Sequence, residues 1–205
     1  LIADRFFNTE KVLSVLFLLS GASMLYLPSI AGEGNGDYFN NIILVHMLLY
    51  MPTLGLTASI SFKLLKNSTK EFPLIRLWGT VGWIAVAFLI SFFDAEKTAT
   101  QFHLGGSAGI ALGFFCLLLP KTKPPLKGKP FDLKSLFFWD AWQQLKTPSF
   151  LIFILGSFAV CLSLAAYYAS LQQQLDAMQI ENISMVKSFG QIVEIGCFFI
   201  MPFFF

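Results

Sequence analysis

Residues 12–30 read VLSVLFLLSGASMLYLPSI, and none of these side chains is charged. The hydrocarbon core of a bilayer is about 30 Å thick, and an α-helix needs about 20 mostly apolar residues to cross it. A strand of a membrane β-barrel would instead alternate apolar and polar residues over about ten positions. The stretch does not alternate, so it predicts a membrane-spanning helix.

The composition of the whole chain supports this prediction. Of the 205 residues, 56% are hydrophobic, 16% are aromatic and 13% are charged, and 24 are phenylalanine. The mean hydropathy is +0.68. Soluble domains carry about 25% charged residues. One soluble domain of this size cannot bury so many apolar side chains, which excludes a soluble enzyme, a disordered tail and a nucleic-acid-binding domain. The net charge of +2 is too small to indicate a polyanionic partner.

Six segments are long and apolar enough to span a bilayer. They cover residues 12–30, 41–61, 72–93, 103–119, 149–172 and 186–205. The fourth segment is the shortest and has little length to spare for tilting. We therefore expect an all-α membrane protein with six transmembrane helices. The chain begins with Leu1 and stops within an apolar run, from which we expect an internal piece of a longer membrane protein.

Basic residues separate the connecting segments into two groups. Eleven lysines and arginines lie in one group, which comprises loops 1–11, 62–71 and 120–148. The other group, comprising loops 31–40, 94–102 and 173–187, contains only Lys97 and Lys187 as basic residues. Cytoplasmic loops are enriched in lysine and arginine. The first group is therefore predicted to be cytoplasmic, and the strict alternation supports the count of six spans.

The longest connection, residues 120–148, divides the spans into four and two. It begins PKTKPP, and these prolines cannot continue a helix. Residues 132–146 then place Leu133, Leu136, Phe137 and Leu145 near one face. This pattern predicts an amphipathic helix on the inner membrane surface.

Small residues and cysteines have structural interpretations. Gly105, Gly109 and Gly113 repeat every four residues, a spacing that lets two membrane helices approach closely. The cysteines are spread over apolar runs without metal-ligand spacing, so we interpret them as packing residues rather than as a disulfide framework. They are Cys116, Cys161 and Cys197.

Two charged residues, Arg76 and Glu194, lie inside apolar spans. A charge at the bilayer centre costs about 2.5–3.5 kcal/mol even on the lenient insertion scale. Such residues usually face a partner or a water-filled cavity. A snorkelling arginine and a hydrogen-bonded structural acid are the alternative interpretations, and we favour a functional role for both.

Neighbouring polar and aromatic residues share helical faces with these charges. Arg76, Thr80 and Trp83 are spaced i, i+4, i+7, and Gln191 and Glu194 are spaced i, i+3. A further stripe consists of His46, Tyr50, Thr53 and Thr57, and it fits either a cavity lining or an interhelical hydrogen-bond seam. Tyr167 and Tyr168 offer rings and hydroxyls from the fifth span.

Together these groups suit a ligand with a flat ring and several hydroxyls. Trp83 and Tyr167 could stack on the ring, while Arg76, Thr80, Gln191 and Glu194 could bond to hydroxyl and carbonyl groups. A single intramembrane arginine is a weak anion trap, which disfavours a phosphorylated ligand. The residues alone do not separate a nucleoside from a sugar.

Four segments carry a resemblance to a known family. They are YMPTLGL at 50–56, FPLIRLWGTVG at 72–82, SFGQIVE at 188–194 and MPFF at 201–204. The chain resembles the nucleoside:proton symporters of the major facilitator superfamily along its whole length. Asp4 and Arg5 resemble the end of that superfamily's cytoplasmic loop motif between its second and third helices.

The resemblance implies a twelve-helix transporter with two six-helix bundles around a central cavity. The six spans would be helices three to eight, with two helices missing before them and four after them. Residues 1–119 would belong to the N-terminal bundle, 120–148 would be the cytoplasmic linker between bundles, and 149–205 would begin the C-terminal bundle. The implied location is the cytoplasmic (inner) membrane of a bacterium.

The resemblance also implies roles for individual residues. Arg76, Thr80 and Trp83 match nucleoside-contacting positions of the fifth helix, and Gln191 and Glu194 match such positions of the eighth. The seventh helix departs from the family pattern: Leu164 and Tyr167 stand where the best-known members have a glutamine and an asparagine. We expect Tyr167 to contact the substrate nevertheless.

The expected function is import of nucleosides by proton symport and alternating access. A carboxyl group holds its proton more tightly when buried and less tightly beside a guanidinium. Glu194 and Arg76 are therefore predicted to couple the proton. We expect no cofactor beyond the proton, no metal and no obligatory protein partner; the partners are the nucleoside and the lipid bilayer.

Two alternatives remain open at this point. One is a major facilitator permease for a sugar or another small polar metabolite. The other is a non-transporting membrane sensor that keeps the fold. An enzyme is disfavoured because the sequence contains no nucleophile–base pair, metal cluster or phosphate-binding loop.

Overall fold

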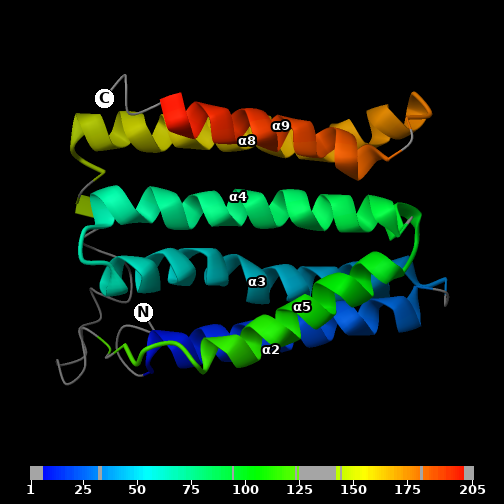
Figure 1. Cartoon of the computed structure of the whole chain (residues 1–205), viewed down its shortest axis with the longest axis horizontal. Helices are drawn as coiled ribbons and strands as arrows, with labels where there is room; N and C mark the ends of the chain where they lie inside the picture. Colours follow the sequence, from blue (N-terminus) through cyan, green and yellow to red (C-terminus); the bar gives the residue numbers. More distant parts are fainter. Residues whose placement is uncertain are drawn as a thin grey trace. The chain divides into compact units, whose positions relative to one another are not determined.

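The computed structural model describes residues 7–31, 34–93, 95–122, 124, 142–143, 145–180 and 182–200 (Figure 1). The described part is helical and contains no strand. Its elements are α2 (Thr9–Ile30), α3 (Gly36–Leu64), α4 (Ser68–Phe92), the 3₁₀-helix η1 (Ala95–Lys97), α5 (Thr100–Cys116), α8 (Pro148–Ala177) and α9 (Ile183–Ile200).

Each of the six predicted segments overlaps one of the six α-helices found among the described residues, which confirms the all-helical prediction; residues 201–205 of the last segment lie outside the described part. Among the described residues, α2, α3, α4 and α8 are long and apolar enough to cross a membrane. The helices α5 and α9 are shorter, at 17 and 18 residues. The predicted amphipathic helix at 132–146 falls mostly outside the described residues, as do the motif residues Asp4 and Arg5.

Helix starts follow from local chemistry. The side chain of Asn35 accepts a hydrogen bond from the Tyr38 N–H at 3.1 Å and so caps α3. Pro148 occupies the first turn of α8, where its missing N–H leaves no hydrogen bond unmade. Pro28, Pro52 and Pro73 lie inside helices. Membrane helices tolerate such prolines because nearby groups satisfy the freed carbonyls.

The closest helix pair is α2 and α5, and Figure 1 shows α5 lying across α2. A Cβ atom added at Gly21 would lie 2.8 Å from the Ile110 backbone nitrogen, and one at Gly109 would lie 3.1 Å from the Gly21 Cα. A Cβ at Gly113 would lie 2.7 Å from the Leu18 Cγ. The predicted packing role of Gly109 and Gly113 is confirmed, and its partner is α2.

Polar contacts join α2, α3 and α5 at the ends that are predicted to face the cytoplasm. Lys63 Nζ donates to Thr9 Oγ1 at 3.1 Å. The N–H and the hydroxyl of Thr122 both donate to Glu10 Oε2, at 3.1 and 2.7 Å. Glu10 is only 3% exposed, so Thr122 holds the first residues after α5 against the start of α2.

An apolar cluster lies beside these contacts, where α2, α3 and α5 meet. It contains Leu13, Phe17, Ile60 and Cys116. The packing interpretation of Cys116 is therefore confirmed. Cys161 and Cys197 are free and exposed in the described structure.

The described elements fall into two compact units. One contains α2, α3, α4, η1, α5 and α9 from Ser184 onward, and the other contains α8. Large apolar side chains are exposed along α3, α4 and α8, and α8 has no buried residue. Exposed apolar surface of this extent fits contact with lipid or with further helices rather than with water.

Candidate functional site

The first group of predicted site residues lies on α4. The helix is continuous from Ser68 to Phe92, so Arg76, Thr80 and Trp83 share one face as the spacing predicted. Thr80 is buried at 4% exposure, whereas Trp83 is 57% exposed. A Cβ atom added at Gly79 would lie 3.6 Å from Arg76 Nη1. The guanidinium therefore lies along the surface of α4, close to the turn that precedes Thr80. An exposed indole and a guanidinium thus flank a short hydroxyl.

The second group lies on α9. This helix is continuous from Ile183 to Ile200, which places Gln191 and Glu194 one turn apart on one face. Both side chains are half-buried. The pair presents an amide and a carboxyl group side by side, an arrangement that can accept hydrogen bonds from adjacent ligand hydroxyls.

The third group lies on α8, in the other compact unit. Tyr167 is 49% exposed, and its ring meets that of Tyr168 edge-on, with centroids 5.4 Å apart. Leu164 lies one turn earlier and is also exposed. Leu164 and Tyr167 therefore lie one turn apart on an exposed face of α8, and the predicted substrate contact of Tyr167 stays a prediction.

The structure brings residues together within each helix. Among the described residues, no side-chain hydrogen bond or ion pair joins Arg76 to Glu194. Proton coupling between these two residues therefore stays a prediction.

The polar stripe on α3 is resolved in part as an interhelical seam. His46 Nδ1 lies 2.9 Å from the Ser20 carbonyl oxygen on α2. A carbonyl oxygen only accepts, so Nδ1 carries the proton and donates it. The His46 ring stacks on Tyr50 with centroids 5.8 Å apart, and Thr53 is buried with its hydroxyl donating to the Tyr50 carbonyl. The His46 hydrogen bond therefore connects α3 to α2, whereas the His46–Tyr50 stacking and the Thr53 hydrogen bond lie within α3.

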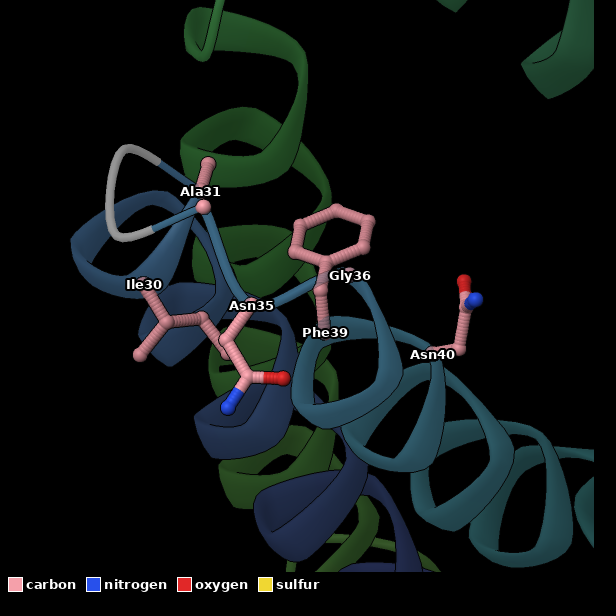
Figure 2. Close-up of a pocket in the computed structure, with 7 residues that line it drawn as sticks. Ile30, Ala31, Asn35, Gly36, Phe39 and Asn40 are labelled. Atoms are coloured by element: carbon pink, nitrogen blue, oxygen red, sulfur yellow. The ribbon is translucent and has the colours of Figure 1, made fainter.

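A surface pocket of about 340 Å³ lies at the turn between α2 and α3 (Figure 2). Ile30, Ala31, Gly34, Asn35, Gly36, Phe39 and Asn40 line it. Figure 2 shows that the Asn40 side chain lies apart from the others, so convergent polar groups are lacking. None of the predicted site residues lines this pocket, and we do not assign the substrate to it.

The described residues contain no group of three His, Cys, Asp or Glu side chains that could hold a metal ion. Sequence reasoning missed one polar contact of interest. The Oε1 of Glu96 in η1 accepts hydrogen bonds from Ser91 and from the first turn of α9. Glu96 lies in the connection 94–102, and a hydrogen bond across 88 residues leaves no local signal in the sequence.

Comparison with known proteins is consistent with these helices and their motifs. A family model described as "Nucleoside H+ symporter" matches residues 1–205. The chain belongs to the nucleoside H⁺ symporter family. It is therefore a multi-pass membrane protein of a transporter family in the major facilitator superfamily, and not an enzyme.

Three relatives from Escherichia coli K12 show the range of similarity. The chain is 33% identical to the "Putative nucleoside transporter YegT" over 210 residues, which cover 99% of this chain and 48% of the relative. It is 26% identical to a xanthosine permease over 220 residues and 25% identical to the nucleoside permease NupG over 218 residues. Each match covers 100% of this chain and 51% of the relative. The chain thus spans about half the length of these relatives.

A solved structure matches the fold. A crystal structure of a mutant of the nucleoside transporter NupG superposes with a TM-score of 0.83 at 23% identity. The match covers 99% of this chain and 53% of that chain. This similarity confirms the helical fold over about half of the NupG chain.

Proposed function

We propose that the protein containing this chain imports nucleosides by proton symport. The observation that carries the proposal is the match of the nucleoside H⁺ symporter model to the whole chain. The exposed Trp83, on the same face of α4 as Arg76, and the Gln191–Glu194 pair support it, because they supply a ring-stacking surface and hydroxyl-binding groups.

The proposal includes a twelve-helix architecture with two bundles. In it, α2, α3, α4 and α5 are helices three to six of the N-terminal bundle within residues 1–119. Residues 120–148 are the cytoplasmic linker with an interfacial helix, and α8 and α9 begin the C-terminal bundle within 149–205. Loops 1–11, 62–71 and 120–148 face the cytoplasm of a bacterial cell, as their lysines and arginines indicate.

Each proposed site residue has a distinct task. Trp83 and Tyr167 stack on the base, and Thr80, Gln191 and Arg76 bond to base and ribose oxygens. Glu194 carries the proton, and Glu194 and Arg76 together couple it to nucleoside movement. The bundles rock about the central site, so access alternates between the two sides. The membrane potential drives inward movement of each positive charge with about 2.3 kcal/mol per 100 mV.

The test is uptake of labelled uridine by cells that lack their own nucleoside carriers and express the full gene. We expect uptake that a protonophore abolishes and other nucleosides inhibit. No uptake of uridine, together with uptake of labelled ribose that uridine does not inhibit, would instead indicate a sugar permease. Saturable uridine binding without counterflow in liposomes would indicate a sensor.

A further inference from the structure

One carboxylate oxygen joins the end of α4 to the beginning of α9. Glu96 Oε1 accepts a hydrogen bond from the Ser91 hydroxyl at 2.9 Å and another from the Ser184 backbone N–H at 2.8 Å. Ser91 lies in the last turn of α4, and Ser184 is the second residue of α9. The contact therefore connects two neighbouring elements, α4 and η1, to α9, whose Ser184 lies 88 residues after Glu96.

The chemistry of this contact favours a specific bond. The first N–H groups of a helix lack partners within the helix, and the aligned peptide dipoles place partial positive charge there. A carboxylate is the strongest acceptor that a side chain can offer to such an N–H group. Ala95 and Ile183, the neighbours of the two bonded residues, are 0% and 1% exposed. Shielding from water strengthens a hydrogen bond between charged and polar groups.

The Glu96–Ser184 contact lies on the side of the membrane that is predicted to be non-cytoplasmic. The segment 94–102 lies in the lysine-poor group of loops, opposite the predicted cytoplasmic side. Under the proposed function, on which this inference rests, α4 and α9 are helices of opposite bundles. A bond between them on one side of the membrane closes that side.

We propose that Glu96 is a latch that holds the non-cytoplasmic side closed. The bond to the Ser184 N–H is made when that side is closed, and it must break before the two bundles separate there. The Ser91 hydroxyl positions the carboxylate, because it donates to the same oxygen.

Substitutions separate the parts of this latch. Glu96→Ala removes both hydrogen bonds, whereas Glu96→Gln keeps an acceptor oxygen and loses the charge. Thr98→Ala is the matched control. The Thr98 hydroxyl donates to the Ala95 carbonyl and accepts from the Thr100 N–H, so both of these hydrogen bonds stay next to η1 and do not reach α9.

The experiment measures the separation of the two elements by pulsed electron spin resonance. Spin labels are attached to Gln101→Cys on α5 and Val186→Cys on α9, two exposed positions near the latch. The background is the full-length protein in lipid nanodiscs, with Cys116, Cys161 and Cys197 replaced. No nucleoside is added.

We expect two distances in the otherwise unchanged protein. Glu96→Ala should raise the ratio of the long to the short distance about threefold to tenfold, which is the loss typical of a helix cap. Glu96→Gln should raise it less, and Thr98→Ala should leave it unchanged.

An unchanged ratio in Glu96→Ala, or an equal rise in Thr98→Ala, overturns the latch, as does a single distance shared by all variants. If Glu96→Ala elutes as an aggregate, the smaller shift expected of Glu96→Gln decides the question. Because the measurement needs no substrate, a latch found in a protein that does not transport uridine would refute only the proposed nucleoside import.

Discussion

Glu194 is the residue on which the proposed coupling depends. It is half-buried on an apolar helix, one turn after Gln191. An ionisable group in such a position is costly in a membrane and usually lies on a substrate or proton route. A glutamine at the same site keeps the shape and the hydrogen-bonding oxygen but cannot carry a proton.

We therefore expect Glu194→Gln to retain nucleoside exchange between the two sides and to lose uphill uptake. The measurement compares counterflow of labelled uridine in liposomes with the number of protons taken up per uridine. Gln191→Ala is the control, and it should weaken binding while the proton count stays unchanged. An unchanged proton count in Glu194→Gln would assign the residue to ribose binding alone.

Trp83 and Trp78 form a matched pair on α4. Both indoles are exposed, at 57% and 73%. Five positions separate them, which places them about 140° apart around the helix. Only Trp83 shares the face of Arg76 and Thr80.

We expect Trp83→Ala to raise the concentration of uridine needed for half-maximal uptake about fivefold to 100-fold. Stacking of a base on an aromatic ring contributes about 1–3 kcal/mol. Trp78→Ala should change it less than twofold. Equal effects of the two substitutions would show that the α4 indoles act through packing or lipid contact.

At the scale of elements, the α2–α5 contact has the tightest geometry. Gly21 faces backbone atoms of α5, which cannot move aside without shifting the whole helix. Gly105 on α5 faces only the Met24 side chain, at 3.6 Å from an added Cβ, which is an ordinary van der Waals distance. Two glycines in one interface therefore differ sharply in the space around them.

We expect Gly21→Ala to destabilise the protein by about 1–3 kcal/mol, because overpacking against backbone forces the helices apart. Gly105→Ala should be nearly neutral. Thermal unfolding in detergent, followed by tryptophan fluorescence, measures both variants. A loss of stability in Gly105→Ala that matched the loss in Gly21→Ala would contradict the interface geometry.

At the scale of the whole molecule, the distribution of basic residues predicts the orientation in the membrane. Asp37 lies in the first turn of α3, in a lysine-poor connection, and Lys66 follows the end of that helix in a lysine-rich one. Both residues are exposed. They should therefore lie on opposite sides of the bilayer.

We expect a membrane-impermeant maleimide to label Asp37→Cys in intact cells, and Lys66→Cys only after permeabilisation. The background again lacks Cys116, Cys161 and Cys197. Labelling of Lys66→Cys in intact cells would reverse the proposed orientation.

The amino-acid sequence was enough to predict the six α-helices of the described residues, because a span of about 20 apolar residues in a bilayer has few alternatives to a helix. It also placed Arg76, Thr80 and Trp83 on one face, and Gln191 and Glu194 on another, because helical periodicity is local. The glycine repeat predicted a close helix contact, although Gly105 proved peripheral to it and Gly21 was missed.

The tertiary structure decided which helices meet. It identified α2 as the partner of Gly109 and Gly113. It also showed that His46, which fitted either a cavity lining or an interhelical hydrogen bond, bonds to Ser20 on α2. It also revealed the bond between Glu96 and Ser184. Such contacts depend on atoms brought together from distant parts of the chain, and a sequence pattern carries only the spacing of neighbours along one helix.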